Sequence, residues 1–137
     1  MTNSLYMKNI YEPAVLQEIN QRLDTLQPDT QRRWGTMDVA QMMAHCSAAL
    51  EVCLGGGTMK STLVGKLLGP FVRPLILSDK PYKPGLPTDK SFIVTGTHDF
   101  NQEKQKLKKL AHQFSTAGEQ AMVNRKHPFF GKLTPMQ

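Results

Sequence analysis

His45 is the residue of this chain whose type and surroundings best suit chemistry. On a helical wheel of about 100° per residue, it lies at the edge of an apolar face, on a stripe with Asp38, Gln41 and Val52. Its neighbours on that helix are small: Ala44, Ala48 and Ala49. Small neighbours leave room for a ligand, and imidazole is a common ligand of borderline metal ions. His45 is therefore a candidate metal ligand.

A single histidine does not make a metal site, because a zinc site usually needs three protein ligands. The position four residues after His45 is Ala49, so no second ligand stands one turn away. From the residues alone, the favoured interpretation is a histidine satisfied by a hydrogen bond at a helix interface. A metal ligand is the alternative.

The other three histidines are weaker candidates for a functional site. We expect His112 on the outer, solvent-exposed face of a helix and a structural role for His98, which precedes a helix cap. His127 stands in a loop before Pro128, from which it could approach a site.

The two cysteines, Cys46 and Cys53, are expected on the apolar face of one helix, where a thiol is inert. Seven residues of helix separate them by about 10 Å, and a disulfide needs Cα atoms within about 7 Å. We therefore expect reduced thiols, which suits the cytoplasm. The chain has no GxGxxG, Walker, CxxC or HExxH motif, and Gly55–Gly57 is interpreted as the end of a helix.

Three amphipathic helices are expected to position these residues, over 12–26, 37–54 and 99–122. Pro13 suits a first helical turn, Thr36 is the expected N-cap of the second helix, and Asp99 with Gln102 resembles a capping box before the third. The apolar stripes of these helices predict an all-α protein.

A long connection over 58–98 separates the second and third helices. A short helix is expected after Ser61, and Pro70 and Pro74 are expected to break or kink its continuation. We expect this helix to pack over the bundle, with a membrane-surface helix as the alternative. Ser91–Thr95 is β-branched and could be extended.

Composition bounds the function. With 137 residues the chain is expected to form one domain. The net charge of +6 permits contact with nucleic acid or an anionic membrane without requiring either. The lysines at positions 104, 106, 108 and 109 are expected to be solvated, and nucleic-acid binding is disfavoured because no stacking aromatic residues lie among them.

No signal peptide and no membrane span is expected, so the predicted location is cytoplasmic.

The chain reaches Thr134, a good N-cap, and Pro135, a good first helical residue, shortly before Gln137. Three helices make an incomplete bundle. We therefore expect a fourth surface from another chain, from a continuation past Gln137, or from the short helices of the 58–77 region.

The segment Trp34–Cys46 resembles the second-helix signature of a bacterial subfamily in the DinB-like superfamily. Three further segments resemble the same subfamily: Gly69–Phe71, Leu86–Asp89 and His127–Thr134. The resemblance covers nearly the whole chain. It implies a four-helix bundle of up-down-down-up topology, in which parallel middle helices need a long crossover, here residues 55–98.

The resemblance also implies a divalent metal, zinc or nickel, held by three histidines. His45 matches the ligand from the second helix, and the other two would come from a fourth helix past Gln137. Asp38 and Gln41 could orient groups around those ligands. Relatives include thiol S-transferases and a thiol-dependent isomerase, so the resemblance implies a metal-dependent thiol transferase or a hydrolase-like enzyme, with a small thiol as the expected substrate. The alternative is a non-catalytic helical protein, associated with stress, that acts as a homodimer or binds a partner.

Overall fold

The computed structural model describes residues 8–56, 63–78, 80–123, 126–127 and 131–135. Four helices account for most of the regular structure: α1 (Pro13–Asp24), α2 (Val39–Cys53), α3 (Leu63–Ile76) and α4 (Phe100–Met122). Lys90–Phe92 form a short 3-10 turn, and β1 (Lys126–His127) pairs antiparallel with β2 (Gly131–Lys132). The predicted all-α class is confirmed, whereas the two-residue strands were not predicted.

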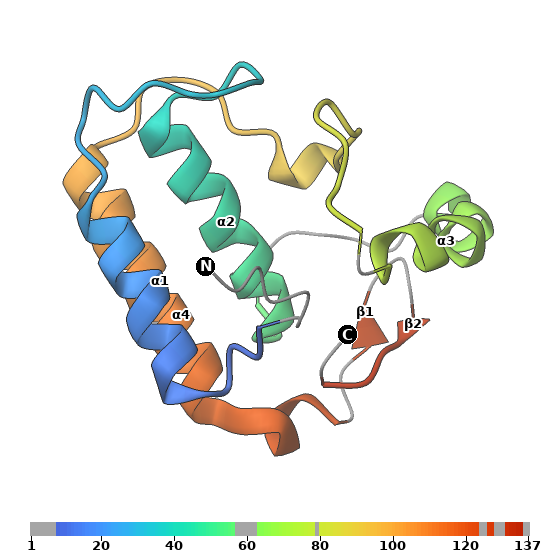
Figure 1. Cartoon of the computed structure of the whole chain (residues 1–137). Helices are drawn as coiled ribbons and strands as arrows, with labels where there is room; N and C mark the ends of the chain where they lie inside the picture. Colours follow the sequence, from blue (N-terminus) through green and yellow to red (C-terminus); the bar gives the residue numbers. More distant parts are fainter. Residues whose placement is uncertain (1–7, 57–62, 79, 124–125, 128–130, 136–137) are drawn as a thin grey trace.

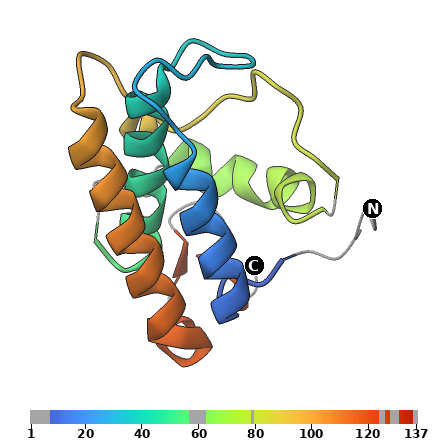
Figure 2. The ribbon, with the colours of Figure 1, turned by 60° about the vertical axis from the view of Figure 1, so that its left-hand side comes forward.

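Three helices form the body of the molecule (Figure 1). α4 packs against both α2 and α1, and Figure 2 shows the three helices standing side by side. α1 runs in one direction, whereas α2 and α4 both run in the other (Figure 1). Because α2 and α4 are parallel, the connection between them must return from the end of α2 to the start of α4. The four-helix order itself stays a prediction.

The core lies where the three helices meet. Met43 of α2 is completely buried, and Leu23 of α1, Val39 of α2 and Leu107 of α4 close around it. Burial of a side chain of this size contributes about 1.5–3 kcal/mol. The core therefore fixes α2, which carries His45, against α4.

Helix caps set where α2 and α4 begin. Asp38, not Thr36, is the N-cap of α2: its carboxylate accepts a 2.8 Å bond from the Gln41 amide, and the Gln41 side chain accepts one from the Asp38 amide. The predicted Thr36 cap is wrong because the helix starts two residues later. The Asp99 cap of α4 is confirmed by its 2.8 Å bond from the Gln102 amide.

Three lysines of α4 that were expected to be solvated also contact neighbouring elements. The Nζ atom of Lys104 donates to the Leu26 carbonyl over 2.9 Å and lies over the Phe100 ring. Lys106 pairs with Glu51 of α2, and Lys108 pairs with Asp24 of α1. Periodicity places these lysines off the buried stripe correctly, but their long side chains still reach the adjacent helices.

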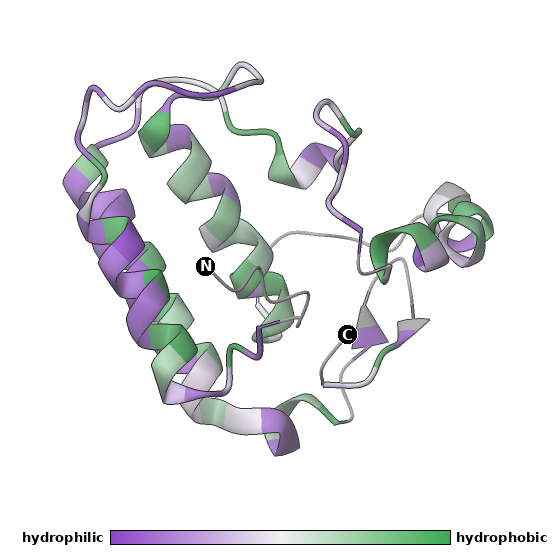
Figure 3. Cartoon of the chain, in the orientation of Figure 1, coloured by the Kyte–Doolittle hydropathy of each residue, from purple (hydrophilic) through white to green (hydrophobic). Residues whose placement is uncertain are grey.

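α3 departs most from expectation. The helix continues through Pro70 and Pro74 to Ile76, so neither proline ends it. It does not pack over the bundle either: none of the extensive contacts between described elements involves α3, and Figure 1 shows it apart from α1 and α4. Figure 3 shows the long apolar stretches of its ribbon.

Two smaller differences concern backbone geometry. The predicted extended segment at 91–95 begins instead inside the 3-10 turn, because the Asp89 side chain caps that turn through the Ser91 amide. α4 is kinked at Gly118, whose φ of 74° belongs to the left-handed region. The expected helix start at Thr134 and Pro135 runs into positions 136–137, which lie outside the described residues.

Candidate functional site

His45 lies half-buried on α2 and is held by the crossover. Its Nδ1 atom is 2.8 Å from the backbone oxygen of Phe92. A carbonyl oxygen only accepts hydrogen bonds, so Nδ1 must carry the proton. In the neutral ring Nε2 then keeps its lone pair, which is the arrangement that metal-binding histidines usually show.

The Phe92 oxygen is placed by the 3-10 turn. Asp89 caps this turn by accepting a 2.9 Å bond from the Ser91 amide and a second bond from the Ser91 hydroxyl. These bonds hold the pKa of the Asp89 carboxyl below its usual range. The Phe92 ring also meets the His45 ring edge-on, with centroids 6.0 Å apart. The crossover therefore fixes both the position and the tautomer of the imidazole.

The described residues do not complete a metal site around His45. Over the part of the chain that the structure describes, no three histidine, cysteine, aspartate or glutamate side chains come together closely enough to hold an ion. His127 belongs to β1, but its side chain lies outside the described atoms. The favoured sequence interpretation, a histidine satisfied by a hydrogen bond, agrees with the Phe92 contact.

Asp38 and Gln41 form the cap of α2. The Gln41 amide group donates over 2.9 Å to the Gly96 oxygen, which ties the end of the crossover to the start of α2. Both side chains thus fix the frame in which His45 and Phe92 meet. Their predicted role around a metal ligand stays a prediction.

His98 and His112 lie where expected. The Nδ1 atom of His98 is 3.0 Å from a Glu103 carboxylate oxygen, and its Nε2 atom is 3.1 Å from the Thr95 oxygen. The Glu103 contact raises the pKa of His98 above its ordinary value. His112 is exposed on α4. His98 is therefore structural, as predicted, because it anchors the loop before α4.

The two cysteines differ in burial. Burial raises the pKa of the Cys46 thiol, which agrees with the predicted inert thiol. Cys53 is exposed at the end of α2, so its predicted place on the buried face is wrong. No disulfide joins Cys46 and Cys53 in this structure.

The α3 apolar face is exposed, whereas we expected α3 to pack over the bundle and gave a membrane-surface helix only as the alternative. Phe71 is 82% exposed and Leu63 is 75% exposed. The face comprises Leu63, Leu67, Leu68, Phe71, Val72 and Leu75. Among the described residues, no large exposed apolar side chain belongs to α1, α2 or α4. The spacing of these residues was visible in the sequence, but it did not reveal which way the face points.

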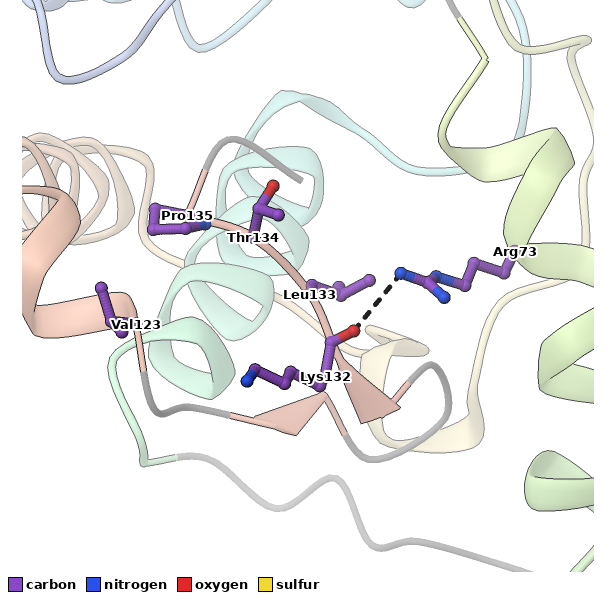
Figure 4. A pocket seen from close by; sticks show the side chains of 6 residues that line it. All are labelled: Arg73, Val123, Lys132, Leu133, Thr134 and Pro135. Carbon is purple, nitrogen blue, oxygen red and sulfur yellow. Dashed lines mark hydrogen bonds between the residues drawn. The ribbon is translucent and has the colours of Figure 1, made fainter.

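An open pocket of about 370 Å³ lies between α3, the end of α4 and the residues after β2. Arg73 reaches across it, and a guanidinium nitrogen donates to the Lys132 oxygen over 3.3 Å (Figure 4). The Nε atom of Arg73 is buried with no hydrogen-bond partner in the described structure. Arg73 thus links α3 to the hairpin.

Comparisons with protein-family models, with curated proteins and with solved structures found no significant match to this chain. Within the described residues, no helix combines the length and apolar character that a membrane crossing requires.

Proposed function

We propose that this chain is a binding protein that works through the α3 apolar face. One observation carries the proposal: six large apolar side chains of a single helix are exposed, whereas the described large apolar side chains of α1, α2 and α4 are buried or partly buried. Soluble monomers rarely expose contiguous apolar patches larger than a few hundred Å². A partner that covers the face would remove this surface from water.

The energy available for binding is large. Burial of a leucine or phenylalanine side chain contributes about 1.5–3 kcal/mol, so a few such residues suffice to offset the cost of association. An exposed apolar face can bind a partner without an enclosed active site, and this is why we propose binding rather than catalysis.

The test is the fluorescence of a dye that binds apolar surfaces. We expect the unmodified protein to bind the dye and Phe71→Ser to reduce the signal severalfold. Because Phe71 is 82% exposed, this substitution should leave the unfolding midpoint nearly unchanged. Trp34→Ser is the matched control, since Trp34 is 63% exposed but lies outside α3. Absence of dye binding, or equal loss in both variants, would refute the proposal.

A second candidate function follows from the His45 geometry. The Nδ1 bond to Phe92 supports a role for Nε2 as one ligand of a divalent metal, as the DinB-like resemblance implies. Such a metal would lower the pKa of a bound small thiol or water. The described residues supply only this one ligand together with the bond that orients it.

Metal content tests this candidate. We expect zinc or nickel to bind at a fixed stoichiometry and His45→Ala to abolish binding, whereas His112→Ala, which changes an exposed histidine, leaves it intact. Metal bound equally by both variants would remove His45 from the site.

A further inference from the structure

We propose that the α3 apolar face docks on an anionic lipid surface, with α3 lying in the plane of the membrane interface. This inference rests on the proposed binding function and names its partner. The juxtaposition that carries it is an outward apolar face on a helix that bears only positive charge.

The two sides of α3 differ sharply. Leu63, Leu67, Phe71 and Leu75 recur every fourth residue and are all exposed. With Leu63 set at 0° on the helical wheel, the α3 apolar face spans roughly 0–180°. The opposite side carries the buried Gly69 and the half-buried Arg73. The hairpin, whose Lys132 oxygen accepts the Arg73 bond, therefore lies on the polar side, and the apolar side is left for a partner.

The length of α3 suits a surface position. Its 14 residues extend about 21 Å, and no described helix meets the requirements for crossing a membrane. A helix with a strong apolar side and a cationic polar side lies along the interface instead. The surface orientation follows from this length and pattern.

The prolines fit the same orientation. Pro70 and Pro74 have no N–H group, so the carbonyls of Lys66 and Pro70 lose their usual helical donors. On the wheel these two carbonyls lie at roughly 300° and 340°, outside the apolar face. There they remain within reach of water, which can donate the missing hydrogen bonds.

Charge selects an anionic partner. α3 contains Lys66 and Arg73 and no acidic residue, and the exposed Lys80 and Lys83 follow it. Within the described residues, none of these four cations belongs to an ion pair. Lys132, whose carbonyl receives the Arg73 bond, adds another exposed cation nearby. Basic residues beside an apolar helix face attract anionic headgroups.

A second copy of the chain fits less well. Two α3 faces in contact would join two helices that each carry Lys66 and Arg73 and no acidic residue, so α3 offers no charge attraction between the copies. A lipid surface supplies negative charge and accepts an apolar face without requiring a matched shape.

The test is co-sedimentation of the full chain with vesicles. We expect binding to vesicles of phosphatidylcholine with phosphatidylglycerol, and much weaker binding to phosphatidylcholine alone. Phe71→Ser combined with Leu67→Ser should weaken binding at least about tenfold, since each loses most of its apolar transfer energy. Lys66→Gln with Lys80→Gln should weaken it only for the anionic vesicles, and Trp34→Ser should leave it unchanged.

Failure of the inference is distinguishable from failure of the proposed function. If the chain ignores both vesicle types while dye binding still depends on Phe71, the lipid inference is overturned and the binding function stands. A dimer in sedimentation velocity that Phe71→Ser dissociates would likewise overturn it in favour of a second copy. Loss of the Phe71 dependence in the dye experiment would overturn the proposed function itself.

Discussion

The Nδ1 atom of His45 and the backbone oxygen of Phe92 lie 2.8 Å apart, although 47 positions separate the two residues. This bond joins the middle of α2 to the crossover. It fixes the imidazole on a rigid helix from one side and on a capped turn from the other. His45 is therefore held in one orientation, as a positioned ligand requires.

The bond predicts the tautomer of His45. Because Phe92 offers only a carbonyl acceptor, the neutral ring should carry its proton on Nδ1. Nitrogen chemical shifts of the neutral imidazole, measured by NMR, report which nitrogen is protonated. We expect the Nδ1–H form for His45 and a mixture of forms for the exposed His112. A dominant Nε2–H form at His45 would contradict the geometry.

His98 predicts a pH-dependent stability. Its two ring nitrogens face the Glu103 carboxylate and the Thr95 carbonyl. Both groups accept hydrogen bonds, so both contacts are satisfied only by the protonated ring. The hydrogen bond that His98 donates to Glu103 accordingly raises the pKa of His98 above its ordinary value of 6.5.

The sign follows from linkage. A raised folded pKa stabilises the protein fully below the unfolded pKa, and this stabilisation is lost as pH rises through the folded value. The difference in unfolding free energy between the unmodified protein and His98→Gln should therefore be larger at about pH 5.5 than at about pH 8.5. Urea unfolding measures it, with His112→Gln as the control. A difference that grows with pH would contradict the assignment.

The burial of Met43 predicts that the stability of the fold depends on the contact between α2 and α4. Its side chain has no exposed surface and packs against Leu23, Val39 and Leu107. Met43→Ala should lower the free energy of unfolding by about 2–5 kcal/mol. Gln105→Ala, at an exposed position of α4, should change it by less than about 0.5 kcal/mol. Equal effects of both substitutions in denaturant unfolding would show that the core lies elsewhere.

The two thiols predict different reactivities. Burial raises the pKa of Cys46 and limits access to it, whereas Cys53 is exposed. Because the thiolate is the reactive form, Cys46 should react with a thiol reagent at least about tenfold more slowly than Cys53 in the folded protein. The single variants Cys46→Ser and Cys53→Ser assign the two rates. Rates that are equal before unfolding would refute the burial of Cys46.

Helical periodicity predicted the body of the fold well. It placed α1, α2 and α4 within two residues of their observed starts and ends, because each helix buries one apolar stripe. It could not predict the kink at Gly118, since a glycine within a helix pattern does not reveal its φ angle. The contact between His45 and Phe92 could not be predicted from the sequence either, because it depends on the path of the crossover.

α3 shows where the pattern misleads. Its apolar spacing is helical, so packing over the bundle was the natural expectation. Periodicity shows that an apolar face exists but not whether this chain covers it. The prolines were equally ambiguous, because Pro70 and Pro74 end a helix only when the lost hydrogen bonds and the ring contacts cannot be accommodated.

The most direct measurement uses one tryptophan placed on the α3 apolar face. Replacing Trp34 by Phe and Phe71 by Trp leaves position 71 with the single tryptophan of the chain. Quenching by acrylamide should be efficient in the isolated protein, because position 71 is 82% exposed, and should fall severalfold when anionic vesicles are added. A tryptophan already protected in the isolated monomer would contradict the claim that this face is the binding surface. Equal quenching with and without vesicles would contradict the claim that the face docks on lipid.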